Sequence, residues 1–240
     1  MPAIEAAAAH RGAGMTGWDR FAETFLNPVV MAKYLPAIVD GFFLTIRLAV
    51  LVIISGIALG LALAVIRALG IRPLNWLIIF VVDLFRALPP LVIIVLIYFG
   101  LPAAEVSIDV FAATWASLTL VLMAFAEEIF WAGITAVPKG QWEAARSTGL
   151  GFGRTLGWVV LPQAIRLTIP PLTNRTIAIT KGTALGSVIG LADILSQASS
   201  GVSHSFNPSP LTLGALAYLI LFVPVVIAGR WIETRFAWKR

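Results

Sequence analysis

Ionisable side chains interrupt long apolar stretches of this chain, and the notable ones are Arg86, Glu127, Glu128, Arg166, Arg175 and Lys181. If these stretches cross a membrane, each charge is costly unless it faces a partner group or a water-filled path. A carboxylate such as Glu128 could bind an ammonium group, and Arg86 or Lys181 could bind a carboxylate. Asn174 and Thr183 could add neutral hydrogen bonds along the same path. The residue types therefore predict a route for a small charged solute.

The same charges could instead pair with one another and hold helices together, or extend to the membrane surface. Asp83 and Arg86 are three residues apart, so one face of a helix would carry both. Pro89-Pro90 and Pro170-Pro171 remove helical hydrogen bonds, and interrupted helices within membranes tend to lie at binding sites and gates. The residues alone leave the structural and the functional interpretation open.

The composition shows which kind of molecule must position these groups. Of the 240 residues, 59% are hydrophobic and only 12% are charged, about half the charged share of a soluble domain. Too few polar side chains remain to cover a surface in water, so we predict an all-α integral membrane protein. The chain has no cysteine, which excludes disulfides and thiol chemistry. We expect no catalytic site, metal or resident cofactor, because the two histidines stand apart from any such cluster.

Five stretches are apolar enough to predict about five transmembrane helices. The clearest is 211–229, which holds no charge over 19 residues. The other four, in chain order, are 42–66, 76–101, 110–137 and a less regular one within 159–189, whose ends are the least defined.

Basic residues alternate between the connecting segments and so predict an orientation. The segment between the first and second spans holds Arg67 and Arg72. The segment between the third and fourth holds Lys139, Arg146 and Arg154. The segment after the last span holds Arg230, Arg235, Lys239 and Arg240. The opposite loops hold neither Lys nor Arg. Because cytoplasmic loops carry the basic excess, we expect the N-terminus outside and the C-terminus in the cytoplasm. The net charge of +5 then needs no nucleic acid as partner.

Residues 1–35 are predicted to form an outer N-terminal tail, disordered at first and then helical at the membrane surface. Trp18, Phe21 and Phe25 recur at helical spacing among charged residues, which favours a short interfacial helix. Pro28 and Pro36 argue against its being a continuation of the first span. Residues 36–240 are predicted to be one transmembrane domain.

The polar segment 139–162 separates two of the apolar stretches. We predict a short helix over 142–148, with Glu143 in its first turn, where a carboxylate suits the helix dipole. Gly149 would end that helix, and Gly151 and Gly153 would give a tight reversal. An ordinary amphipathic connector would fit these features equally well.

The order of residues in this segment resembles a known family. Glu143-Ala144-Ala145, Gly149 and Leu161-Pro162 fit the pattern EAA-x3-G-x9-I-x-LP of permease subunits of ABC importers, with Val159 for the isoleucine. The flanking KGQ at 139–141 and LPQAIR at 161–166 resemble the polar amino-acid uptake group, of the histidine and glutamine permease type. Weaker similarities are PPL-x-N at 170–174, K-x-T-x-L at 181–185, FRALP at 85–89 and EI at 128–129. The resemblance covers roughly residues 36–240.

The resemblance implies a type I ABC importer permease in the bacterial inner membrane. Its partners would be a second copy or a paralogue, two ATP-binding cassette subunits and an external solute-binding protein. Coupling to the ATPase would rest on Glu143, Ala144, Ala145, Gly149, Leu161 and Pro162. ATP and Mg²⁺ would bind to the partner, since this chain has no GxxxxGK[ST] loop.

Departures from the family pattern leave the cargo open. Trp131-Ala132-Gly133 stands where the family usually has RGG, and Gly182 where KDTSL has an aspartate. The substrate would be a polar amino acid or another small amine-bearing solute, with Arg86, Glu128, Asn174, Lys181 and Thr183 as candidates along its path. The alternative is a self-sufficient secondary transporter or channel that uses Glu127 and Glu128. It lacks the paired half-repeats of many such proteins and leaves the 139–162 pattern unexplained.

Overall fold

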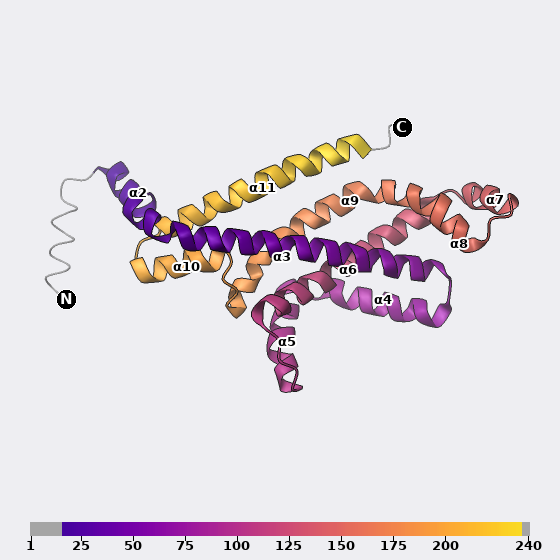
Figure 1. Ribbon diagram of the computed structural model, residues 1–240, viewed down its shortest axis with the longest axis horizontal. Coiled ribbons are helices and arrows are strands. Elements are labelled where there is room, and N and C mark those ends of the chain that lie inside the picture. The colour runs from indigo at the N-terminus through magenta and orange to yellow at the C-terminus, as the bar shows by residue number, and fades with distance from the viewer. Residues whose placement is uncertain (1–15, 237–240) are drawn as a thin grey trace. The chain divides into compact units, whose positions relative to one another are not determined.

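The computed structural model describes residues 16–236, and within them every regular element is helical (Figure 1). The predicted all-α class is therefore confirmed. The chain divides into two compact units, Met1–Thr45 with Ala192–Phe222, and Ile46–Leu191 with Val223–Arg240. The expected disorder of the first residues lies outside the described range.

The first unit begins with a short helix, α2 (Gly17–Phe25), at the position that the aromatic spacing predicts. Thr16 caps it: its Oγ1 accepts a hydrogen bond from the Asp19 amide at 3.2 Å, and its own amide donates to Asp19 Oδ2 at 3.0 Å. Such a reciprocal cap satisfies amides that the first turn leaves unpaired. The rings of Trp18, Phe21 and Phe25 follow one another at centroid distances of 5.6 and 5.0 Å and are exposed. An amphipathic helix is present; its place at a membrane surface stays a prediction.

Helix α3 (Pro28–Ala68) follows after two residues. Pro28 separates it from α2, as predicted, but Pro36 lies inside α3 and does not interrupt it. A proline removes one helical hydrogen bond, and a helix of 41 residues keeps its course with the remaining ones. The first unit is completed by α10 (Ile194–Ser205) and the first part of α11 (Ser209–Phe236), packed around Ile38, Ile194, Ala198 and Ala217.

The second unit is organised around α6 (Val110–Ala136), which packs against α4 (Arg72–Ala87), α5 (Pro90–Ala103) and α9 (Leu161–Lys181). The rest of α3 also lies close to α6: a Cβ on Gly60 would come within 2.6 Å of the Ala126 Cβ. Leu118, Leu122 and Ala126 are fully buried along α6. Helix α6 is surrounded by other helices, and it is accordingly apolar on most of its sides. The predicted span over 110–137 is confirmed as a helix.

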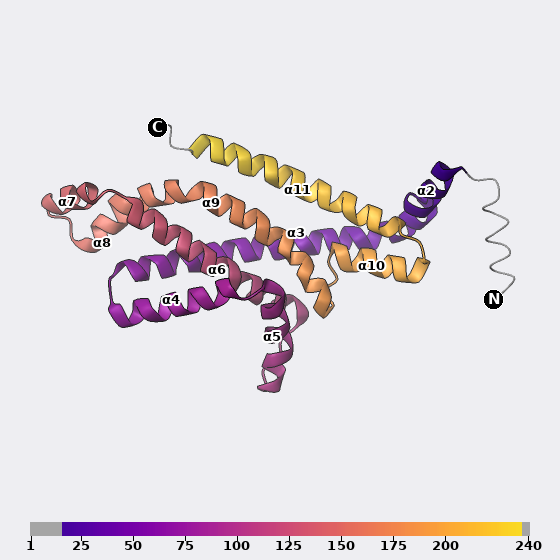
Figure 2. The same cartoon turned by 180° about the vertical axis from the view of Figure 1, so that it is seen from behind.

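Among the described residues, three helical stretches are long and apolar enough to cross a membrane: Gly17–Ala68, Val110–Ala136 and Ser209–Arg235. The number rises to five if each of two bent pairs counts as one span. The predicted span over 76–101 is formed by two helices, α4 and α5, which meet at 104° (Figure 1, Figure 2). The helix break predicted at Pro89-Pro90 is therefore confirmed. Leu88 and Pro89 are extended at the bend, with ψ of 137° and 136°. A residue before proline avoids the helical region, so the two successive prolines fix this corner.

The tandem prolines at 170 and 171 behave differently, since both lie inside α9. The expectation that they interrupt a helix is therefore wrong. A 3-10 helix, Gly182–Ile189, continues from the end of α9.

Candidate functional site

The segment 139–162 contains a short helix, α7 (Lys139–Ser147), then α8 (Phe152–Thr155) and a π-helix, Leu156–Val160, that leads into α9. Helix α7 begins at Lys139, three residues earlier than predicted, directly after Pro138. Glu143 therefore lies in the second turn and not in the first, and the predicted contact with the helix dipole is wrong. The end of α7 is as predicted: Gly149 has φ of +87° and its amide donates to the Arg146 carbonyl at 3.0 Å.

Within residues 139–162 only Gly149 has a positive φ. Gly151 caps α8 with φ of −66°, and Gly153 lies inside α8. The reversal of the chain thus depends on the left-handed backbone of one glycine, which has no Cβ to oppose it.

The two alanines of the pattern face different ways. Glu143 and Ala144 are exposed, whereas Ala145 is 8% exposed. Trp142 stacks on Phe152 at 5.6 Å and packs against a cluster of buried residues that includes Phe130, Leu156 and Val160. Helix α7 is therefore anchored on one side to the core of its unit, and its Glu143–Ala144 side is available to a partner.

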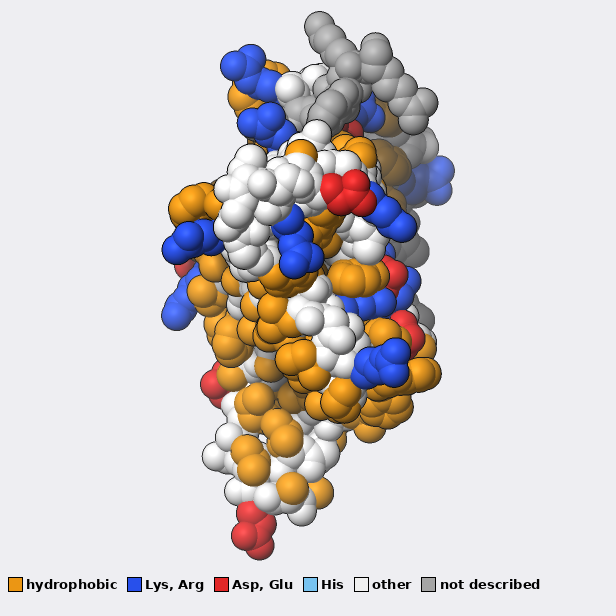
Figure 3. Space-filling model, turned by 90° about the vertical axis from the view of Figure 1, so that its right-hand side faces the viewer, with side chains coloured by type: hydrophobic (Ala, Val, Ile, Leu, Met, Phe, Trp, Pro, Cys, Tyr) orange, Lys and Arg blue, Asp and Glu red, His pale blue; other side chains and the backbone are white. Residues whose placement is uncertain are grey.

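Three exposed basic side chains lie on α7 or close to it in sequence: Lys139 and Arg146 on α7 and Arg154 on α8. Figure 3 views the end of the molecule that carries α7 and shows Lys and Arg side chains gathered there. A surface of this charge suits an acidic partner surface.

The π-helix at 156–160 was not predicted from the sequence. Gln163 Nε2 donates to the Val159 carbonyl at 2.7 Å, and Leu161 and Pro162 form the first two residues of α9. Pro162 cannot donate a backbone hydrogen bond, and a wider turn directly precedes it. Turns of this kind are frequent at functional sites.

A cluster of charges joins α3, α4 and α6. Both carboxylate oxygens of the fully buried Glu127 accept from Arg67 Nη1, at 3.1 and 3.2 Å. Arg86 Nη1 lies 3.2 Å from Glu128 Oε2 and 3.4 Å from Asp83 Oδ1. The local Asp83–Arg86 pair is as predicted. Two residues predicted along the solute path, Arg86 and Glu128, are paired with each other.

Sequence reasoning assigned Arg67 to a loop and missed its role in this cluster. Arg67 stands in the last turn of α3, and its guanidinium lies over the ring of Trp131 at 4.5 Å. Trp131 is one of the departures from the family pattern, and this contact gives it a structural reason. Arg175, on α9, lies over the ring of Phe125 at 3.0 Å. Long-range contacts such as these leave no local spacing to recognise.

The other predicted path residues lie elsewhere in the second unit. Asn174 Nδ2 donates to the Pro170 carbonyl at 3.4 Å, and the buried Thr183 donates to the Thr180 carbonyl at 2.7 Å. Both bind the backbone of their own segment rather than Arg86 or Glu128. Lys181 is exposed and ends α9.

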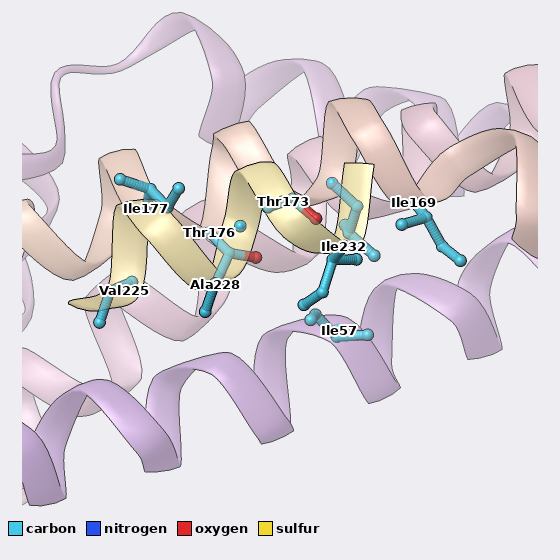
Figure 4. Close-up of a pocket in the computed structure, with 10 residues that line it drawn as sticks. Ile57, Ile169, Thr173, Thr176, Ile177, Val225, Ala228 and Ile232 are labelled. Atoms are coloured by element: carbon cyan, nitrogen blue, oxygen red, sulfur yellow. The ribbon is translucent and has the colours of Figure 1, made fainter. Parts of the chain in front are cut away.

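Three of the cavities formed by described residues of the second unit bear on the site. One of about 490 Å³ is lined by Arg86 and Arg175, and another of about 350 Å³ by Glu128. The third, of about 420 Å³, is formed by apolar and threonine side chains of α3, α9 and α11 (Figure 4). Figure 4 shows Ile57, Thr173 and Ile232 at this third cavity, which has no charged lining residue. Among the described residues, no group of acidic or histidine side chains could hold a metal ion.

Comparison with known proteins decides the family. The family described as "Binding-protein-dependent transport system inner membrane component" matches residues 56–238 of this chain. The chain belongs to this family. The match contains the whole 139–162 segment and the charge cluster.

Curated proteins similar to this chain include two of Bacillus subtilis (strain 168). The probable glutamine ABC transporter permease is 35% identical over 211 residues, which cover 88% of this chain and 98% of the relative. The arginine transport system permease is 33% identical over 203 residues, with 84% and 93% covered. Among solved structures, an amino acid ABC transporter crystallised with histidines is 33% identical, with a TM-score of 0.78 and 86% and 97% of the chains covered. The predicted resemblance and the permease fold are confirmed.

Proposed function

We propose that this chain is the membrane-spanning permease subunit of an ATP-driven importer for a polar amino acid or a related amine-bearing solute. The observation that carries the proposal is α7, whose Glu143–Ala144 side is exposed while its opposite side is anchored to the core. The printed names of the relatives, a glutamine and an arginine permease, support an amino acid as cargo. The family description supports a separate solute-binding protein.

In this proposal α7 faces the cytoplasm and docks into an ATPase subunit. Glu143 and Ala144 form the contact, and Ala145 fits the helix to its own core. Gly149 supplies the sharp turn at the end of α7. The π-helix then passes the displacement to Leu161 and Pro162, the first residues of α9. Because one side of α7 packs against the core of its unit, a displacement of this short helix would move the core residues that contact it.

The assembly would be a dimer of this chain with a second copy or a paralogue, two ATP-binding cassette subunits and an external binding protein, in the bacterial inner membrane. ATP and Mg²⁺ belong to the cassette subunits. The basic side chains around α7 support its cytoplasmic location, because positive residues accumulate on that side.

The solute path would include Arg86, Glu128, Asn174, Lys181 and Thr183. Arg86 lines one cavity and Glu128 another, and the two side chains are paired at 3.2 Å. A passing solute with both an ammonium and a carboxylate could exchange partners with this pair. Such an exchange keeps every charge compensated, which lowers the cost of moving a zwitterion through an apolar region.

The experiment is transport by proteoliposomes that contain this chain, its ATPase and its binding protein. We expect ATP-dependent accumulation of at least one of the twenty amino acids, measured by mass spectrometry of the vesicle contents. Accumulation without ATPase, driven by an ion gradient, would instead establish a secondary transporter. No accumulation of any amino acid would contradict the proposed cargo class.

A further inference from the structure

The cavity of about 490 Å³ lies at the corner between α4 and α5, against α6 and α9. Pro89 and Pro90 line it from the corner, and Gly182 from the start of the 3-10 helix. Its volume is within the range of small-molecule sites, which are commonly about 300–1,000 Å³.

Both charged side chains that line this cavity are arginines, Arg86 and Arg175. Arg86 is compensated, because Glu128 and Asp83 lie 3.2 and 3.4 Å from its Nη1. No described carboxylate lies within ion-pair distance of Arg175. Its Nε is buried and has no hydrogen-bond partner among the described residues. The cavity therefore carries one positive charge without an anion.

Phe125 holds the Arg175 guanidinium in place. The Cζ atom lies 3.0 Å from the centroid of the Phe125 ring, and the Cζ of Arg86 lies 5.7 Å from the same ring. The face of an aromatic ring attracts a cation stacked on it. The N–H groups point outward in the plane of the guanidinium, so the ring accepts no hydrogen bond from them. Those in-plane donors are the ones that bind a carboxylate in a bidentate manner.

We propose that this cavity is a carboxylate-binding subsite, in which Arg175 binds the carboxylate of the transported solute. The inference rests on the proposed import function and adds to it a residue and a chemical requirement. Leu118, Val121 and Ile179 line the cavity beside the arginines, so the group next to the carboxylate contacts apolar side chains. Before any exchange of partners with the solute, Arg86 pairs with Glu128 and supplies positive potential, while Arg175 makes the direct contact with the solute carboxylate.

The test first uses the complete transporter in proteoliposomes. The external mixture holds the twenty amino acids together with histamine and agmatine, which are histidine and arginine without the carboxylate. Wild-type transporter is expected to accumulate carboxylate-bearing solutes and to leave both amines outside. Accumulation of an amine at the rate of its parent amino acid would overturn the inference and leave import intact. No import at all would overturn the proposed function instead.

The second step measures equilibrium binding of the accumulated amino acid to the permease–ATPase complex in nanodiscs, without the binding protein. Arg175→Gln is expected to raise Kd about tenfold or more, since a charge-assisted bond is lost. Arg175→Lys keeps the charge but not the planar fork, and an intermediate Kd is expected. Arg166→Gln is the matched control, because Arg166 lies on the same helix, is exposed and does not line the cavity. Its Kd is expected to equal that of the wild type.

Unchanged Kd in Arg175→Gln would overturn the inference. If that variant fails to insert, Arg175→Lys decides in the same way, with membrane abundance as the check on folding. An anionic lipid headgroup is the other anion that Arg175 could bind, and mass spectrometry of co-purified lipid tests for it. Loss of a bound anionic lipid in Arg175→Gln with unchanged amino-acid Kd would assign Arg175 to a headgroup and overturn the subsite.

Discussion

The segment 139–162 and the charged cavity are built in opposite ways. The first is local: Gly149 binds the Arg146 carbonyl, and Trp142 stacks on Phe152. The second joins distant parts of the chain, with Arg86 on α4, Phe125 on α6 and Arg175 on α9. Both regions lie within residues 56–238, the part that matches the family, and in our proposal the local segment contacts the ATPase. In our proposal the cavity binds the cargo, and the relatives are named for different amino acids, glutamine and arginine.

Gly149→Asp gives the largest expected effect, because it alters the local segment directly. A residue with a Cβ is strained at φ of +87°, and the new charge lies beside α7, the proposed docking helix. ATP-dependent uptake by proteoliposomes is expected to be abolished while membrane abundance is retained. Gly153→Asp adds the same charge within α8, at ordinary helical geometry, and is expected to keep most of the uptake. Normal uptake by Gly149→Asp would remove the difference between the two regions.

Arg67→Met addresses the cluster as a structural element. Glu127 is fully buried and Arg67 pairs with both of its oxygens, so its loss leaves an unpaired buried charge. We expect a loss of about 3–5 kcal/mol in unfolding free energy, measured by thermal unfolding in detergent. The double variant Arg67→Met with Glu127→Leu should recover most of that stability. Failure of the second change to rescue the first would show that Arg67 acts through Trp131 and not through Glu127.

Glu128→Gln gives the smallest effect on the fold. The Glu128 side chain is 41% exposed and its pairs are of the partly solvated kind, which contribute about 0–1 kcal/mol. Uptake should fall more than membrane abundance, because the change removes a charge from the proposed solute path. Asp83→Asn removes the other partner of Arg86 and should leave uptake near the wild-type rate. Equal uptake by wild type and Glu128→Gln would assign this carboxylate to structure.

Local patterns in the sequence predicted local structure well. The aromatic spacing located α2, the apolar run located α6, and Gly149 marked the end of α7. Two pairs of prolines that look alike in the sequence behave differently: Pro89-Pro90 form a corner of 104°, and Pro170-Pro171 lie inside α9. Whether a helix continues past a proline depends on how other segments pack around it, and the local sequence does not specify that packing.

For the candidate site as well, the local part could be predicted from the sequence and the long-range contacts could not. The predicted coupling pattern is a run of residues close in sequence, and in the structure Ala145 is buried in the core while Ala144 is exposed. The pairing of Arg67 with Glu127, and the position of Arg175 over Phe125, arise only when α3, α6 and α9 pack together. Residue types showed that these charges need partners, but the tertiary structure decides which partners they have.

Cysteine labelling tests the central proposal most directly, because the chain has no cysteine of its own. Ser147→Cys places a thiol on the exposed end of α7, and Ser200→Cys places one on an exposed position of α10. A membrane-impermeant reagent is expected to label Cys at 147 only from the cytoplasmic side, and to be blocked there when the ATPase is bound. It should label Cys at 200 from the outside. Labelling at 147 from the outside, or labelling unaffected by the ATPase, would contradict a cytoplasmic docking helix.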